Sequence, residues 1–270
     1  MNIKKKLVLC VVTMSLGVFL NQSMVWAKLS VAPQYVVFDK GMSKVQNVSV
    51  INNSDKEKTY NVKLLHYRQK EDGSYETVEK EENDNKFADS LIFFGPRRFT
   101  LAPKEVQTIK IQKKPKADLE AGEYKSHMLF QEAEDEKPMV KETNPNAKGM
   151  SFTITGLYGV AIPVVVRNGD LIATAEFKNV KHTKEDQKDL ITFDLLRDGN
   201  KSLHGDVVVK YQDKQIGILK GINVFLSVKK RNLSVALKTT DLNVKDLEGK
   251  TLTVEYISDG KVLTSSEVVY

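Results

Sequence analysis

The sequence predicts an all-β protein built from two β-sandwich domains. Short runs rich in β-branched and aromatic residues recur along the chain, turn residues separate them, and no convincing amphipathic helix appears. The dipeptides Asp198-Gly199 and Asp259-Gly260 are typical of hairpin turns. The sequence Asn168-Gly169-Asp170 is a sharp break, after which the rhythm of strands starts again. We therefore predict one sandwich over 28–168 and a second over 169–270.

Residues 1–27 have the features of a secretory signal peptide. A basic run at 4–6 precedes an apolar core at 7–20, which is too short to span a membrane comfortably. Val25-Trp26-Ala27 then supplies a small-residue cleavage site. We therefore expect an exported chain that begins at Lys28 and is not inserted in the membrane.

Charge and cysteine content narrow the classes of protein further. The whole chain has a formal net charge of +6, and loss of the three lysines in the signal segment lowers it to +3. So mild an excess favours neither a nucleic-acid-binding nor a membrane-surface protein. The single cysteine, Cys10, lies in the signal segment, and Leu9 before it does not fit a lipid-attachment site. The exported chain must therefore be held together by its hydrophobic core, without disulfides.

The first sandwich is predicted from seven or eight strands at a rhythm typical of immunoglobulin-type domains. Val106–Ile111, for example, alternates as a strand with one buried face does. Pro33, within the run Leu29–Phe38, indicates an edge or a kink. We interpret the charged stretch Glu76–Asn85 as a solvated excursion. The expected strands are 29–38, 45–51, 60–67, 91–94 continuing to 101, 106–111, 123–130 and 150–167, with a polar loop at 131–149 before the last.

The second sandwich is predicted from the same features over about a hundred residues. No close sequence repeat relates the two halves, so only the architecture is shared. The expected strands are 171–177, 190–196, 207–211, 215–219, 223–226, 233–237, 252–257 and 262–269.

The segment Met150–Arg167 is central to the functional interpretation. Its even positions are apolar apart from Gly156, and small polar residues alternate with them at 151, 153 and 155. At about 3.3 Å per residue it would reach roughly 60 Å, whereas the usual strand has about six residues. Two interpretations remain open: a core strand of its own sandwich, or a strand whose surplus apolar length is offered to a folding partner. A bare edge of this kind would need cover from a partner, a second copy of the chain or the polar loop.

No constellation for catalysis or metal binding emerges. The four histidines, His66, His127, His182 and His204, have separations that match no zinc-ligand spacing. The exported chain has no thiol nucleophile, no Gly-x-Ser-x-Gly elbow and no phosphate-binding glycine loop. Acidic pairs lie mostly in polar loops, although two carboxylates that meet in a cleft would revive a hydrolase. We therefore expect a protein that is not an enzyme and has neither cofactor nor metal.

Three arginines are candidates for binding carboxylates. The doublet Arg97-Arg98 could clamp a carboxylate, because guanidinium groups suit bidentate acceptors, but we favour surface ion pairing at a strand start. Arg167 ends a wholly apolar run at the domain junction, where an unpaired charge would be costly. We expect it to pair with a carboxylate, and Asp259 is the predicted partner.

Four stretches of the first domain resemble the PapD-like periplasmic pilus chaperones, and they are spread over the whole domain: Leu29–Asp39, Gly95–Pro103, Gly122–Phe130 and Val160–Gly169. The second domain is similar more loosely, by its length and by Asn200–Asp206 and Gly217–Ile222. The resemblance implies two immunoglobulin-like sandwiches set at an angle like a boomerang, and a location in the periplasm.

The resemblance also implies a mechanism. Chaperones of this family bind pilus (fimbrial) subunits by donor-strand complementation, without an energy source, and deliver them to an outer-membrane usher. The donor residues would then be Met150, Phe152, Ile154 and Tyr158. Arg167 would be the buried arginine of the domain junction, in agreement with a pair to Asp259. A self-dimer is a further expectation for the client-free chain.

The sequence departs from the family pattern at two positions. Many members grip the terminal carboxylate of the client with two basic residues, whose places are taken here by Tyr35 and Pro163. Lys125, Arg97 or Arg98 are the alternatives for this anchor. Two other functions remain open: an exported adhesin or carbohydrate-binding pair of sandwiches, and an exported hydrolase on the same fold.

Overall fold

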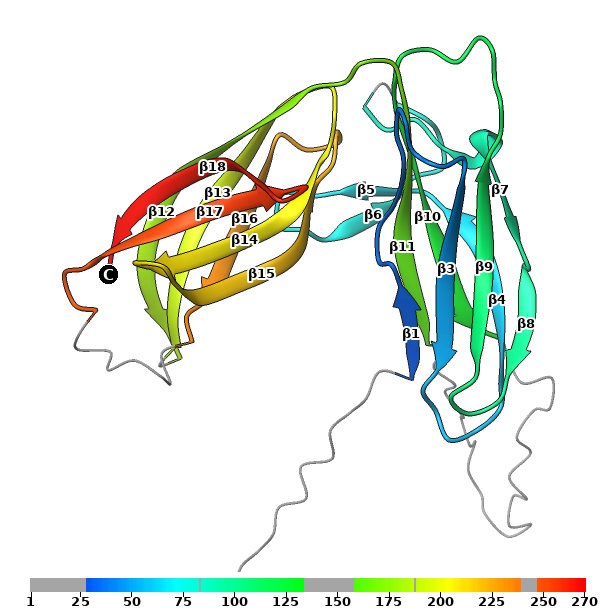
Figure 1. Ribbon diagram of the computed structural model, residues 1–270, viewed down its shortest axis with the longest axis horizontal. Helices are drawn as coiled ribbons and strands as arrows, with labels where there is room; N and C mark the ends of the chain where they lie inside the picture. Colours follow the sequence, from blue (N-terminus) through cyan, green and yellow to red (C-terminus); the bar gives the residue numbers. More distant parts are fainter. Residues whose placement is uncertain (1–27, 83, 134–157, 187, 239–246) are drawn as a thin grey trace, which may run out of the picture.

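The computed structural model describes residues 28–82, 84–133, 158–186, 188–238 and 247–270, and their regular secondary structure is almost entirely β-strand. Two sandwiches lie at an angle to each other and meet at one end, so the molecule is shaped like a boomerang (Figure 1). The expected all-β architecture of two sandwiches is thus confirmed. The predicted signal segment 1–27 lies outside the described residues.

The first sandwich consists of a four-stranded and a five-stranded sheet, in which strands from distant parts of the chain are neighbours. The four-stranded sheet has the order β1 (Leu29–Ala32), β3 (Val45–Asn52), β9 (Val106–Lys113) and β7 (Ile92–Gly95). The five-stranded sheet has the order β2 (Val36–Phe38), β11 (Gly159–Asn168), β10 (Gly122–Glu132), β4 (Lys58–Leu65) and β8 (Arg98–Leu101).

The expected first strand, 29–38, is divided between the two sheets. β1 pairs with β3 in one sheet, and after Pro33 the chain crosses over, so that β2 pairs in parallel with β11 in the other. Proline cannot donate to a strand ladder, which suits the crossover point. Because the residues of β1 pair in the other sheet, only the short strand β2 lies beside β11, and it does not cover the whole edge.

The second sandwich consists of a three-stranded and a four-stranded sheet. The first contains β12 (Ala173–Glu185), β13 (Lys188–Gly199) and β16 (Lys230–Ala236), in that order. The second contains β15 (Lys214–Val224), β14 (Leu203–Tyr211), β17 (Thr251–Ser258) and β18 (Lys261–Val269). The expected strands 215–219 and 223–226 are largely one element, β15, because a shift in its register opposite Gly205–Val207 lets the chain continue without a turn.

Each sandwich has a hydrophobic core of its own. Alternating positions of the strands supply it, as a period of two requires. The first core includes Phe38, Phe130 and Ile162, and the second includes Leu195, Val209 and Tyr256. In the described part of the chain the one helix is the 3-10 turn η1 (Asp89–Leu91), and no helix is long and apolar enough to cross a bilayer.

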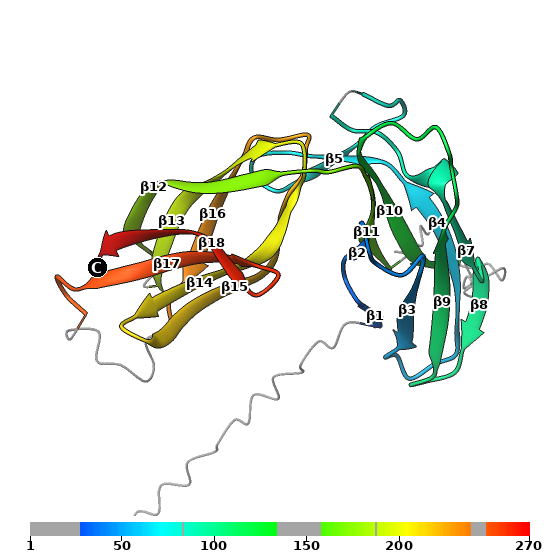
Figure 2. The ribbon, with the colours of Figure 1, turned by 45° about the horizontal axis from the view of Figure 1, so that its top comes forward.

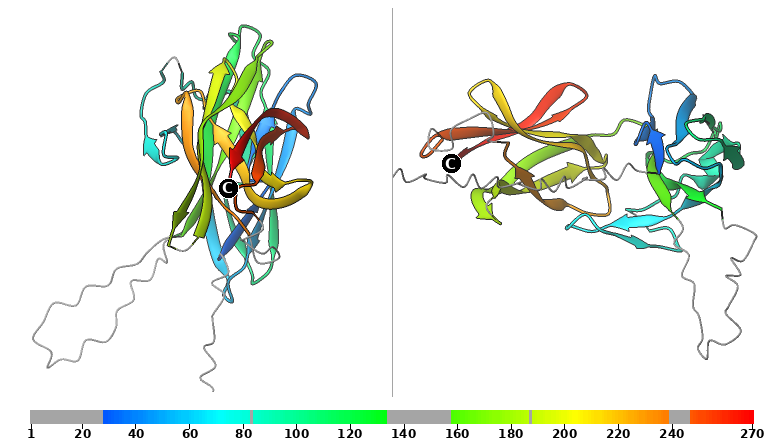
Figure 3. Two further views of the ribbon diagram at one scale, coloured as in Figure 1. Left: turned by 90° about the vertical axis from the view of Figure 1, so that its left-hand side faces the viewer. Right: turned by 90° about the horizontal axis from the view of Figure 1, so that it is seen from below.

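A two-stranded hairpin leaves the first sandwich and reaches the second. Strands β5 (Tyr67–Gln69) and β6 (Tyr75–Thr77) form this interdomain hairpin, which extends across the angle between the sandwiches (Figures 1 and 2). The view from below shows the same hairpin beside the second sandwich (Figure 3). Part of the stretch expected as a solvated excursion is therefore ordered: Glu82 forms an ion pair with Arg68, and Asn85 is buried.

Candidate strand-docking edge and domain junction

The strand β11 is paired along its whole length on one side only. β10 lies antiparallel to it from Gly159 to Asn168. On its other side β2 covers only Val164–Val166. Within the described residues, no strand pairs with this side over 159–163, which we call the outer edge of β11. An unpaired strand edge of this kind is a template for another strand.

The hydrogen-bond pattern shows which backbone groups the outer edge presents. The N–H of Glu132 donates to the C=O of Tyr158, and successive residues of an antiparallel strand alternate between the two sides. The backbone groups of Gly159 and Ala161 therefore point away from β10. Pro163 falls on the same side, where its missing N–H costs no bond to β10. The parallel pairing of Val164 with Val36 directs the C=O of Pro163 to β2, so the outer edge offers the two donors and two acceptors of Gly159 and Ala161.

The side chains of β11 divide between two environments. Ile162 and Val164 belong to the core of the first sandwich, and Val160 packs against it. Gly159 and Ala161 are exposed, so no large side chain covers the backbone of the outer edge. Of the predicted donor residues, Met150, Phe152 and Ile154 lie outside the described residues. Tyr158, the remaining one, precedes β11 directly and is 37% exposed.

The doublet Arg97-Arg98 is not near the outer edge. Arg98 begins β8, which is the far strand of the five-stranded sheet, and three strand spacings of about 4.8 Å separate it from β11. Its guanidinium donates to Oδ1 of Asn61, and the Arg97 guanidinium lies 4.8 Å from the centre of the Phe94 ring. The structure therefore places both arginines away from any strand docked on β11.

Lys125 is close to β11 but buried. It lies on β10 opposite Val165, is 6% exposed, and its ammonium is 4.2 Å from the centre of the Phe225 ring of the second sandwich. Burial lowers the pKa of Lys125 from 10.5 to about 8, although Glu123 and Asp84 favour its charged form. In this arrangement Lys125 has no access to a chain end in solvent.

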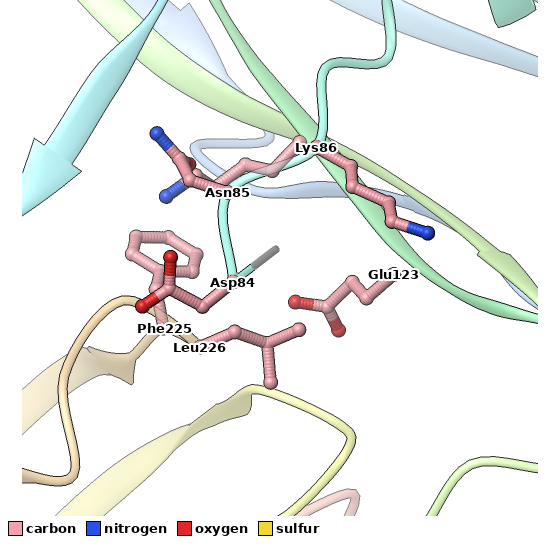
Figure 4. Close-up of a pocket in the computed structure, with 7 residues that line it drawn as sticks. Asp84, Asn85, Lys86, Glu123, Phe225 and Leu226 are labelled. Carbon is pink, nitrogen blue, oxygen red and sulfur yellow. The ribbon is translucent and has the colours of Figure 1, made fainter. Parts of the chain in front are cut away.

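A small cavity lies beside Lys125 at the junction of the two sandwiches. Asp84 and Asn85 line it from one side, Glu123 from another, and Phe225 and Leu226 close it from the second sandwich (Figure 4). Its volume of about 10 Å³ for the centre of a water-sized sphere is close to the minimum that a single water needs. The junction is therefore closely packed.

The side chains of Asn85 and His127 are buried at the junction and have no hydrogen-bond partner within the described residues. The imidazole of His127 is surrounded by the rings of Tyr67, Tyr75 and Phe225, all at edge-on geometry. Burial and the neighbouring charge of Lys125 lower the pKa of His127 to about 3. His127 is therefore neutral at any pH near 7.

Arg167 is the centre of an ion-pair network, but its partners differ from the prediction. Its Nε donates to Oε2 of Glu123 at 3.0 Å and its Nη1 to Oδ2 of Asp39 at 3.0 Å. The predicted pair with Asp259 is wrong: no ion pair joins the two among the described residues. The reason is the register of β10 and β11, which places Glu123 directly opposite Arg167 within the first sandwich.

The same network connects the two sandwiches. Nη2 of Arg167 donates to the backbone C=O of Ser202, and the N–H of Ser202 donates to Glu123. Tyr35, where the family pattern has a basic residue, accepts a hydrogen bond from Arg167 and stacks on His204 at 3.9 Å. Tyr35 thus serves the junction instead of an anchor.

The interdomain hairpin makes the most extensive polar contact between the sandwiches. Gln69, which is 1% exposed, accepts from the N–H of Phe225 at 3.1 Å and donates to the C=O of Asn223 at 3.3 Å. The C=O of Glu71 accepts from the N–H of Asn232, and its carboxylate pairs with Lys230 at 3.3 Å. The Gln69 side chain therefore satisfies two backbone groups of the second sandwich, as a neighbouring strand would.

Gln69 could not be predicted from the sequence, because a glutamine in a polar stretch carries no periodic signal. The signal for Glu123 was weak, because it lies in a strand that also contains lysine, serine and histidine. No group of three His, Cys, Asp or Glu residues in the described part of the chain could hold a metal ion.

No protein-family model and no curated protein matches the sequence. Several solved structures are similar in fold. The periplasmic chaperone SfaE aligns over 90% of this chain and all of its own, at 13% identity and a TM-score of 0.43. The E. coli chaperone DraB aligns over 88% of this chain and 94% of its own, at 12% identity and a TM-score of 0.42.

A third similar structure is a complex. A chain of the CsuC–CsuE chaperone–tip adhesion subunit pre-assembly complex, from the archaic chaperone-usher Csu pili of Acinetobacter baumannii, aligns over 90% of this chain and 98% of its own. The identity is 10% and the TM-score 0.43.

Proposed function

We propose that this protein is a periplasmic chaperone that binds pilus subunits through the outer edge of β11 and delivers them to an outer-membrane usher. The observation that carries the proposal is the backbone over 159–163, which pairs with no strand on its outer side among the described residues. A subunit that lacks one strand of its own sandwich would pair with this edge and gain the missing strand.

The proposed donor residues continue the pattern of β11. Val160 and Ile162 point into the core, and Met150, Phe152, Ile154 and Tyr158 have the same parity in the sequence. Alternating side chains of a strand share one face, so these residues are available to fill the groove of a subunit that extends beyond β11. A second copy of the chain would cover the same edge in the absence of a subunit.

The energetics favour strand addition over a charged anchor. Three or four apolar side chains of this size contribute about 1.5–3 kcal/mol each on burial, before the cost of ordering them. Truncation of one partner of a desolvated charge contact costs about 2–5 kcal/mol of binding free energy. Because Arg97 and Arg98 lie at the far edge and Lys125 is buried, we propose that this chaperone holds its client mainly by the strand.

The test uses a proline on the outer edge. Ala161→Pro removes the outward N–H and leaves the ladder to β10 intact, as the natural Pro163 does two residues later. Loss of one backbone bond and the bulk of the ring should weaken capture of a co-expressed pilus subunit by about tenfold. The measurement is the fraction of subunit that co-purifies from periplasmic extract, with the melting temperature of the variant as a check of folding.

The matched control is Thr100→Pro on β8, at the other edge of the same sheet. The N–H of Val62 donates to the C=O of Arg97, so Thr100 also has its backbone groups pointing outward. This variant should capture the subunit as the wild type does. Equal loss of capture in both variants, or no loss in either, would refute the assignment. Charged substitutions at Phe152 and Ile154 should likewise abolish capture without unfolding the chain.

A further inference from the structure

A strongly basic pocket lies at the end of the first sandwich beside the link to the second. The turn that follows β2 forms one wall, the segment that follows β9 forms the other, and Asn168 closes it. Its volume is about 290 Å³. Five lysines line it, and they give the pocket its name here: Lys40, Lys44, Lys113, Lys114 and Lys116.

The positive charge of the basic pocket is poorly compensated. Its one acidic side chain, Asp39, is engaged by Arg167, and Lys113 donates to a backbone carbonyl. Lys40 pairs with Asp170, but both side chains are at least 80% exposed, so the pair contributes little. No ion pair involves the other three lysines in the part of the chain that the structure describes. A chain with an exported net charge of only +3 thus concentrates its excess charge at one hollow.

The pocket also has an apolar component. Leu119 contributes to its lining, and Met42 on its rim is 50% exposed. A methionine adapts its shape to different partners. A hollow with ammonium groups around apolar side chains suits an extended segment that carries both carboxylates and an apolar residue. A flat bilayer surface would meet the rim and leave the hollow unfilled.

We propose that the basic pocket is a second binding site, which takes an acidic polypeptide segment of a partner protein. The site is separate from the outer edge of β11: Asn168 lies five residues beyond Pro163, or roughly 16 Å along the strand at about 3.3 Å per residue. Both surfaces can therefore be occupied at once. This inference does not depend on the proposed chaperone function.

The test measures binding of a fluorescein-labelled peptide that alternates Asp or Glu with Leu, by fluorescence anisotropy on the exported chain 28–270. We expect saturable binding that weakens as salt is raised, because salt screens exposed charges. The variant Lys44→Glu/Lys114→Glu/Lys116→Glu should bind about tenfold more weakly or worse, because each exposed ion pair that it removes contributes about twofold to the affinity. The milder Lys→Gln variant at the same positions should have an affinity between those of the wild type and the Lys→Glu variant.

The matched control reverses three exposed lysines of the second sandwich that form no ion pair among the described residues: Lys184, Lys214 and Lys220. This control has the same net charge as the test variant and should bind within about twofold of the wild type. Equal weakening by both triple variants would overturn the proposal, as would equal binding of a peptide with Asn and Gln in place of the acids. Binding of phosphatidylglycerol vesicles through the same lysines, with no binding of the peptide, would assign the pocket to a membrane surface instead.

Discussion

Lys125 should weaken the folded state, although it is a buried residue at the domain junction. Its ammonium has no carboxylate at ion-pair distance among the described residues and lies 4.2 Å from the centre of the Phe225 ring. We predict that Lys125→Met, which keeps the volume and removes the charge, stabilises the protein at pH 7. The variant should retain pilus-subunit capture, because the buried ammonium is not the client anchor.

The size of the effect follows from the pKa of Lys125. A fall from 10.5 to about 8 corresponds to about 3 kcal/mol of lost stability, at about 1.4 kcal/mol for each unit. The cation–π contact with the Phe225 ring stabilises the folded state by about 0.5–2 kcal/mol. The net gain on substitution is therefore about 1–3 kcal/mol.

The pH dependence provides the sharper test. Between pH 8 and 10.5 the unfolded chain keeps the proton of Lys125 while the folded chain releases it, so the wild type becomes more stable as pH rises. The advantage of Lys125→Met should therefore be largest at pH 7 and shrink towards pH 10. Urea unfolding at a series of pH values measures it, with exposed Lys110→Met as the control. A variant that is less stable than the wild type, or whose advantage is independent of pH, would refute this reasoning.

Two other substitutions test the junction. Arg167→Met should cost about 3–5 kcal/mol in urea unfolding, because it leaves the carboxylate of Glu123 buried without its cation; adding Glu123→Gln should recover part of the loss, and no recovery would contradict the pairing. His127→Phe should raise stability by about 1–3 kcal/mol, since it removes two buried nitrogens that have no partner in the described structure. The unfolded chain binds a proton at His127 below about pH 6.5 and the folded chain only near pH 3, so the wild type loses stability between these values as pH falls. Thermal melts at pH 4 and 7 should show a smaller difference for His127→Phe than for the wild type, and an equal difference would contradict the assignment.

Local patterns in the sequence were enough to predict the class of fold and many strands. The expected strands 45–51 and 106–111 agree with β3 and β9 to within two residues at either end. These strands have one face in the core, so their apolar and polar side chains alternate with a period of two. Gly169, which lies in the predicted break, has a positive φ that suits glycine.

Contacts between distant strands were beyond the reach of local patterns. The partner of Arg167 depends on the register of β10 against β11, which is set by packing over the whole sheet and not by any neighbouring residue. The free edge of β11 depends on where β1 crosses to the other sheet. The burial of Lys125 depends on a phenylalanine one hundred residues further along the chain. Each of these features is a property of the assembled pair of sandwiches.

The contact made by Gln69 has a consequence for the engineering of chimeras. Its amide fits the backbone at Asn223 and Phe225, so a foreign second domain would leave that amide buried opposite groups of the wrong geometry. Exchange of the second domain would therefore succeed only when the hairpin 67–77 is exchanged with it. The unit that can be exchanged is the second sandwich together with the interdomain hairpin of the first.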